Sequence, residues 1–77
     1  MAIRSEPQPA LGRAIRSARE ERGMMQEELA HRADLHPTWI SHLESGQKNP
    51  TWATVARIAA ALEMRVSELA ALSERER

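Results

Sequence analysis

Cysteine is absent from this chain of 77 residues, so neither disulfide bonds nor thiolate metal sites can stabilise its fold. Long apolar runs are also absent, because none approaches the roughly 20 residues that a membrane-spanning helix needs. The chain does not open on the pattern of a signal peptide. These absences predict a soluble, cytoplasmic protein with no membrane partner. A domain of this size buries only ~60% of its unfolded surface, so dimerisation is the expected source of further stability.

An excess of positive charge is missing too. Eleven basic side chains balance eleven acidic ones, whereas many nucleic-acid-binding domains are strongly basic. The charges are unevenly distributed: residues 10–22 carry four arginines against two glutamates, and residues 23–35 carry three acidic residues against one arginine. A DNA-binding protein with this balance should have modest non-specific affinity and should depend on dimerisation and a defined site.

Catalytic and metal-binding patterns are not recognisable either. The sequence shows no Ser/His/Asp order, no phosphate-binding loop and no convergent pair of carboxylates. His31, His36 and His42 are the only histidines, and without cysteines or second-shell partners they do not predict a zinc site. We therefore expect no enzymatic activity, no cofactor and no metal. The sequence identifies no small-molecule effector.

The spacing of the apolar residues predicts five short helices and no strand. The predicted helices span residues 10–22, 26–33, 37–45, 52–62 and 66–72, with a flexible arm over residues 1–9 and a frayed charged tail over residues 73–77. Gly23 and Gly46 end the first and third helices, and Thr51 is a good N-cap for the fourth. Trp52, which begins the fourth helix, is expected in the core. The predicted fold class is all-α, a compact bundle of five short helices that forms one domain over residues 10–72.

The most informative segment runs from Gln26 to Pro50, where two short amphipathic helices flank a tight break. The apolar stripes of these helices consist of Leu29, Ala30 and Ala33 in the first and Ile40 and Leu43 in the second. Between them, Pro37 disfavours helical geometry at His36 and suits the first turn of a new helix. Two short helices joined in this way form a helix-turn-helix, whose second helix can enter the major groove of DNA.

An ordered set of residues in this segment matches a known pattern. The set comprises Gln26, Glu28-Leu29-Ala30, Ile40-Ser41, Leu43-Glu44, Gly46 and Asn49-Pro50. In these residues the chain resembles the lambda-repressor-like family, also called the XRE or Cro-repressor type, over about residues 11–72. The resemblance implies a transcriptional regulator, more often a repressor than an activator, that binds double-stranded DNA sequence-specifically. It would bind a palindromic operator as a homodimer, with the helix over residues 37–45 in the major groove.

The resemblance also assigns roles to individual side chains. The base-reading residues would be Pro37, Thr38, Ser41 and His42; the phosphate-contacting residues would be Gln26, Trp39, Ser45, Gln47, Lys48 and Asn49. A structural ion pair would join Arg19 to Glu44. Because long bidentate readers such as arginine are missing from the base-reading positions, shape readout and dimer spacing should supply part of the specificity. The alternatives are that the base-reading and loop positions are merely solvated and that Trp39 only packs.

The dimer interface is expected on exposed parts of Val66, Leu69 and Leu72, although the same residues would also suit the core. A rival hypothesis from another functional class is a protein-interaction module, such as an antitoxin or an adaptor. The neutral charge and the short side chains at the base-reading positions favour this rival. The chain also departs from the family pattern at three helix boundaries, where Met25 replaces a capping Ser or Thr, Asp34 replaces Gly, and Glu63 replaces Gly or Asn.

Overall fold

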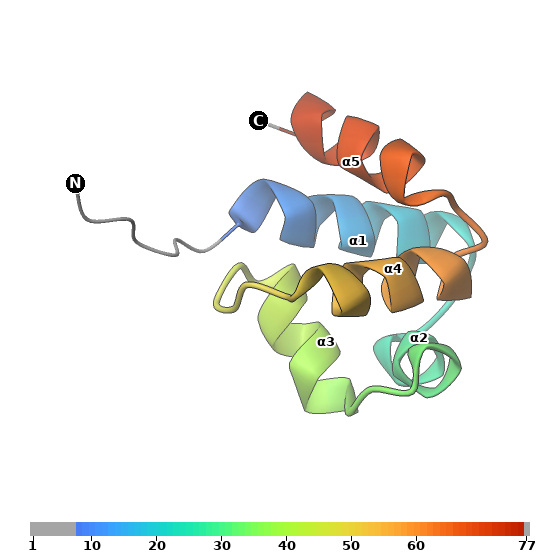
Figure 1. Ribbon diagram of the computed structural model, residues 1–77. Helices are drawn as coiled ribbons and strands as arrows, with labels where there is room; N and C mark the ends of the chain where they lie inside the picture. The colour runs from blue at the N-terminus through green and yellow to red at the C-terminus, as the bar shows by residue number, and fades with distance from the viewer. Residues whose placement is uncertain (1–7, 77) are drawn as a thin grey trace.

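The computed structural model describes residues 8–76, and all regular secondary structure within that range is α-helical (Figure 1). The helices are α1 (Pro9–Glu21), α2 (Gln26–Ala33), α3 (Pro37–Glu44), α4 (Trp52–Ala61) and α5 (Val66–Arg75). The all-α five-helix prediction is therefore confirmed, and the first four helices end within one residue of their predicted bounds. Helix α5 continues three residues beyond its predicted end, so residues 73–75 are helical rather than frayed. Residues 1–7 of the predicted arm lie outside the described residues.

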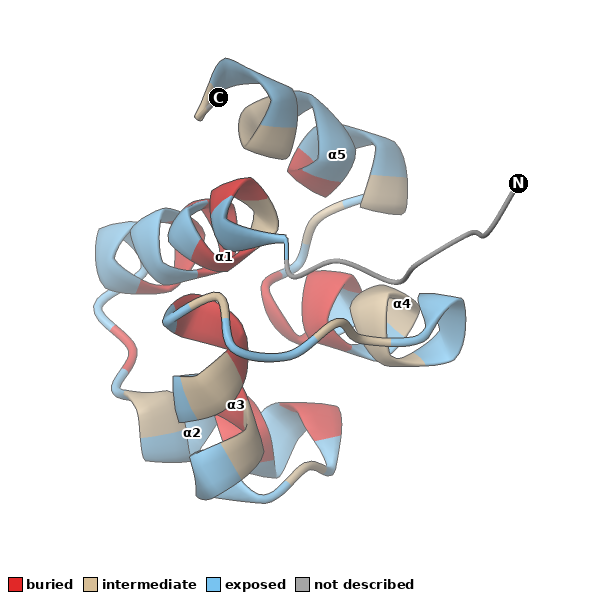
Figure 2. Ribbon diagram, turned by 90° about the vertical axis from the view of Figure 1, so that its left-hand side faces the viewer, coloured by how far each residue is buried: buried red, intermediate tan, exposed pale blue. Residues whose placement is uncertain are grey.

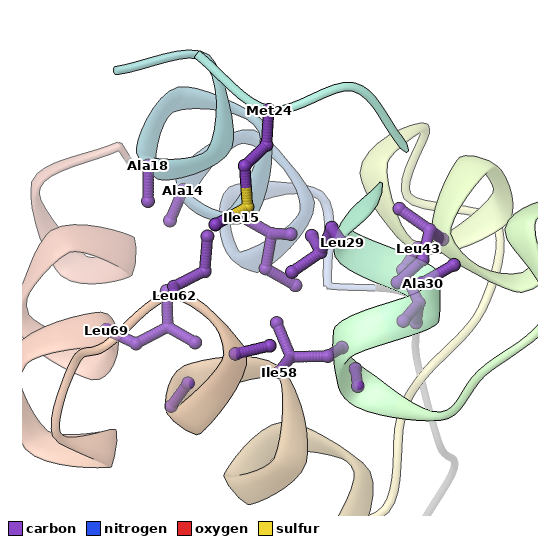
Figure 3. Close-up of a cluster of buried hydrophobic side chains, with 14 residues drawn as sticks. Ala14, Ile15, Ala18, Met24, Leu29, Ala30, Leu43, Ile58, Leu62 and Leu69 are labelled. Atoms are coloured by element: carbon purple, nitrogen blue, oxygen red, sulfur yellow. The ribbon is translucent and has the colours of Figure 1, made fainter. Parts of the chain in front are cut away.

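The core lies where the five helices meet. Helix α1 packs against both α5 and α3, while α2 contacts α3 and α4 (Figure 1). The fully buried large side chains are Ile15, Leu29, Ile40, Leu43, Ile58, Leu62 and Leu69. Figure 3 shows side chains of α1, α2 and α4 converging in this cluster. Among the described residues, no helix is both long enough and apolar enough to cross a membrane.

Gly12 allows α1 to approach α3 very closely. A Cβ atom added at Gly12 would lie 2.2 Å from the carbonyl oxygen of Leu43 and 2.9 Å from that of Glu44. Any side chain at this position would therefore collide with the backbone at the end of α3. The position of α3 is thus set by direct contact with the backbone of α1.

Two helices end in a non-glycine residue with left-handed backbone geometry. Asp34 has φ 57° and Glu63 has φ 58°, which is the geometry that glycine would adopt without strain. Arginine side chains bind the carbonyl groups at both of these helix ends. Arg57 Nε donates to the carbonyl of the last α2 residue at 3.0 Å, and Arg22 Nε donates to the carbonyl of Leu62 at 2.6 Å. Long-range hydrogen bonds therefore support both boundaries where glycine is missing.

The helix N-termini differ in how they are capped. The Oγ1 atom of Thr51 accepts from the backbone N–H of Thr54 at 3.2 Å, as expected for an N-cap. Met25 holds the corresponding position of α2 and makes no side-chain cap. The absence of a cap at this boundary agrees with the sequence analysis.

Trp52 is not in the core, because its relative exposure is 74%. It belongs to the apolar stripe of α4, but burial falls along that stripe toward its start. Ile58 is buried, Val55 is half-buried and Trp52 is exposed. The first turn of α4 thus extends past the helices that cover the rest of the stripe.

Candidate nucleic-acid interface

Helices α2 and α3 form the predicted helix-turn-helix. Asp34 ends α2, Leu35 packs partly buried against the core, and His36 caps α3. Ile40 and Leu43 anchor α3 in the core, with exposures of 0% and 2%. The opposite face of α3 is therefore free to meet a ligand (Figure 2).

The predicted base-reading residues occupy this outer face. Pro37, Thr38 and Ser41 are exposed, and His42 is half-buried. Ser45, just past the end of α3, donates from its hydroxyl group to the carbonyl of His42 at 3.1 Å. The predicted base-reading positions of α3 include no arginine, lysine or acidic side chain.

A buried ion pair joins α1 to the end of α3, as the resemblance implied. Arg19 Nε donates to Glu44 Oε2 at 2.7 Å, and Arg19 Nη2 donates to Glu44 Oε1 at 3.0 Å. The two residues are only 9% and 8% exposed. Arg19 also donates to the carbonyl of Met24 at 2.7 Å. Its hydrogen bond to Glu44 raises the pKa of the guanidinium group, and burial opposes this rise.

Gln26, the predicted phosphate contact, extends this pair to α2. Its Nε2 atom donates to Glu44 Oε1 at 3.0 Å. The carboxylate of Glu44, on α3, therefore accepts hydrogen bonds from a side chain of α1 and from a side chain of α2. Sequence reasoning missed this link, because the two residues are 18 positions apart and no local pattern connects them.

The loop between α3 and α4 holds most of the other predicted phosphate contacts. Ser45, Gln47 and Lys48 are exposed, and Asn49 is half-buried. Gly46 has φ 78°, and a Cβ atom added there would lie 3.1 Å from Pro9. Glycine is therefore favoured at position 46 for two reasons: the backbone there is left-handed, and a side chain would crowd Pro9 at the start of α1. The loop presents the single lysine of the chain to solvent.

Trp39 lies half-buried on α3 and packs against the core cluster. This placement fits a packing role for Trp39, and it leaves part of the indole at the surface. No group of three His, Asp or Glu side chains within residues 8–76 is arranged to hold a metal ion.

The three residues predicted for the dimer interface do not share a surface. Leu69 is fully buried in the core, so the prediction that it has an exposed part is wrong. Val66 is half-buried and lines an apolar groove of about 480 Å³ between α1, α4 and α5. Leu72 lines a different hollow, beside Arg22 and Arg75. The helix period places these residues on one stripe, but α1 covers the middle of that stripe.

The apolar groove is lined in part by Trp52, which the sequence analysis placed in the core. Its lining includes Leu11, Trp52, Val55, Val66 and Ala70. Trp52 and Met25 are the large hydrophobic residues that stand exposed in the described part of the chain. We call the groove together with Trp52 the tryptophan groove.

Comparison with known proteins agrees with this geometry. The family model of the helix-turn-helix domain matches residues 10–72. The immunity repressor protein of Bacillus phage phi105 is 32% identical over 59 residues, which are 77% of this chain and 41% of the phage protein. The chain spans about two fifths of the length of the curated relatives it matches.

Solved structures give the same result. The clp gene regulator ClgR from Corynebacterium glutamicum matches with a TM-score of 0.84 and 31% identity over 88% of each chain. The restriction-modification controller protein C.Esp1396I, solved as a tetramer in complex with its natural 35-base-pair operator, matches with a TM-score of 0.84 and 29% identity over 95% of this chain and 96% of that one. The chain therefore belongs to the helix-turn-helix family of DNA-binding transcription regulators, in its lambda-repressor-like branch.

Proposed function

We propose that the protein binds a palindromic operator in double-stranded DNA as a homodimer and represses transcription by occupying a promoter. The observation that carries this proposal is the outer face of α3, which is anchored from behind by Ile40 and Leu43 and presents Thr38 and Ser41 to solvent. An exposed polar face on a rigidly held second helix is the geometry that places side chains against base edges. The phage relative is an immunity repressor, and the controller relative was solved on its operator.

The proposed contacts divide into two groups. Pro37, Thr38, Ser41 and His42 would face base edges, while Gln26, Trp39, Ser45, Gln47, Lys48 and Asn49 would face phosphates. Phosphate contacts set the register of a protein on the duplex, and base contacts supply the sequence information. Lys48 contributes the only full charge among the phosphate group. The salt dependence of binding should therefore be shallow for each protomer.

The dimer in this proposal forms through the tryptophan groove. A two-fold interface requires a surface that complements itself, and this surface carries both a protruding Trp52 and an apolar hollow beside it. The chain has no net charge that would repel a second copy. Each Trp52 would then pack into the groove of the other protomer. A two-fold arrangement would set the two α3 helices roughly 34 Å apart, on half-sites one helical turn from each other.

Selection of bound duplexes from a random DNA library tests the proposed function. An enriched inverted repeat with half-sites one turn apart supports the dimeric reader. Recovery of no motif by folded protein would contradict the proposal and would favour the protein-interaction module.

Two substitutions then test the DNA-facing surface. Lys48→Ala should weaken operator binding and reduce the salt slope by about one. Arg65→Ala is the matched control, because it removes the same charge at the turn between α4 and α5, on the other side of the core from α3 (Figure 1). Equal losses in the two variants would mean that general charge, rather than the proposed contact, governs affinity.

The oligomeric state tests the interface separately. Trp52→Ser should convert the dimer to a folded monomer, as measured by analytical ultracentrifugation. Met25→Ser removes the other exposed large hydrophobic side chain and should leave the dimer intact. A Trp52→Ser variant that stays dimeric would show that the interface lies elsewhere.

A further inference from the structure

The turn between α2 and α3 is held by a side chain from α4. Asp34, at the end of α2, has left-handed geometry that disfavours any residue with a Cβ atom. Arg57 Nε donates to the carbonyl of Ala33 at 3.0 Å, and Arg57 Nη2 donates to the carbonyl of Asp34. One guanidinium group therefore satisfies two successive carbonyls at a helix end, where intrahelical bonds leave them open.

The hydrogen bonds of Arg57, rather than its charge pair, are the stronger part of this contact. Arg57 Nη2 also lies 3.7 Å from the Oδ2 atom of Asp34, but the Asp34 side chain is fully exposed and that of Arg57 is 46% exposed. Ion pairs in such surroundings contribute little. The bond to the Ala33 carbonyl is partly buried, and the negative end of the α2 dipole favours a cation there. Arg57 therefore binds chiefly the backbone of the turn.

This turn sets the direction in which α3 leaves α2. Gln26 links the start of α2 to Glu44 at the end of α3, and Arg57 holds the opposite end of the helix pair, where the chain passes from one helix to the other. Resting on the proposed function, we propose that Arg57 is a positioning residue for DNA binding. It acts from α4, through the backbone of the turn and without touching DNA, and keeps α2 and α3 at the angle at which both meet one operator half-site.

The turn between α4 and α5 provides a matched control, because it repeats the same arrangement outside the helix-turn-helix. Glu63 is left-handed with φ 58°, and Arg22 Nε donates to the carbonyl of Leu62 at 2.6 Å. Arg57→Met and Arg22→Met each remove one guanidinium group and keep an unbranched side chain. The two variants therefore lose the same kind of contact, and only the first loses it next to α3.

Each turn also contains an amide that reports whether the turn is closed. The N–H of Leu35 donates to the carbonyl of Ala30, and the N–H of Met64 donates to the carbonyl of Ala59, both at 2.8 Å. Amide hydrogen exchange, followed by NMR on folded protein without DNA, measures the opening of both. Arg57→Met should speed exchange at Leu35 by about tenfold relative to Met64, near the upper end of what one net hydrogen bond contributes. Arg22→Met should do the reverse. Equal acceleration of both amides in Arg57→Met would contradict a local role for this arginine.

Operator binding then tests the positioning role. A protein whose binding-competent geometry is only partly populated loses apparent affinity in proportion. Arg57→Met should therefore bind the operator recovered by selection up to about tenfold more weakly for each half-site, with an unchanged salt slope because no phosphate contact is lost. Arg57→Lys keeps the charge but not the fork, and its loss should be intermediate. Arg22→Met should bind as the unmodified protein does.

A second substitution separates positioning from direct contact with DNA. Asp34→Gly, introduced into Arg57→Met, should restore part of the operator affinity, because glycine adopts left-handed geometry without strain. A salt slope lowered by about one in Arg57→Met would show that Arg57 itself binds phosphate and would overturn the proposal. Unchanged operator affinity in that variant would overturn it as well. Failure of the proposed function would look different, since no operator would be recovered with the unmodified protein.

Discussion

Removing the charge of Glu44 should be the most destabilising polar substitution in the fold. Glu44→Gln keeps the size of the side chain but leaves the Arg19 guanidinium, only 9% exposed, without a carboxylate. Breaking a buried pair on one side costs about 3–5 kcal/mol. A chain of this length has a total free energy of unfolding of roughly 4–12 kcal/mol, at 0.05–0.15 kcal/mol per residue. The loss is therefore a large fraction of the whole, and the variant should be partly unfolded at 37 °C.

Urea unfolding followed by far-ultraviolet circular dichroism measures this loss. The matched control is Glu20→Gln, which breaks the solvent-exposed pair between Arg16 and Glu20, whose side chains are 63% and 55% exposed. That variant should lose no more than about 0.5 kcal/mol. Combining Arg19→Met with Glu44→Gln should recover part of the stability, because no uncompensated charge stays buried. The reasoning fails if Glu44→Gln costs as little as the control, or if the double variant is no more stable than Glu44→Gln alone.

Three further substitutions test individual helix boundaries and contacts by thermal unfolding. Met25→Ser should stabilise the fold by about 1 kcal/mol, because the new hydroxyl group would cap α2 and Glu28 stands where a capping box needs it; Met25→Ala should give no such gain. Glu63→Gly should also stabilise, by about 1 kcal/mol, since it relieves left-handed strain at φ 58°, and a lower melting temperature would contradict this. Gly12→Ala should destabilise by at least the 1–3 kcal/mol of a typical overpacked site, because its Cβ would collide with the carbonyl of Leu43; an unchanged melting temperature would show that α1 and α3 can separate at no cost.

The helices could be predicted from the sequence because their signals are local. Helix α2 begins and ends where the apolar stripe and the break before Pro37 place it. Thr51 caps α4 through a bond to a residue three positions away. Asp34 adopts the left-handed geometry that the family pattern implies when it replaces glycine. These signals lie within a few residues of one another, although Arg57 of α4 also supports the left-handed turn at Asp34.

The features that could not be predicted depend on contacts between distant parts of the chain. Helix α5 continues past Leu72, and Arg13 of α1 donates to the carbonyl of Glu76 at 2.8 Å, which satisfies a group at its end. Trp52 and Leu69 both lie on apolar stripes, yet one is exposed and the other is buried. Periodicity identifies the face of a helix that turns inward, but it does not say how far the covering helices extend. Burial along a stripe therefore needs the tertiary structure.

Helix α3, the proposed DNA-reading helix, is positioned in part by α1, which supplies none of the proposed DNA contacts. Helix α1 meets the end of α3 through the backbone at Gly12 and through the Arg19–Glu44 pair, and Glu44 in turn holds Gln26 at the start of α2. The proposed phosphate contact and the proposed reading face are thus fixed to the same carboxylate. A change at Glu44 should alter both the stability of the fold and the geometry of the DNA contacts. Gln26→Ala should alter the DNA contacts with a smaller loss of stability, because it removes one hydrogen bond to Glu44 and leaves the ion pair intact.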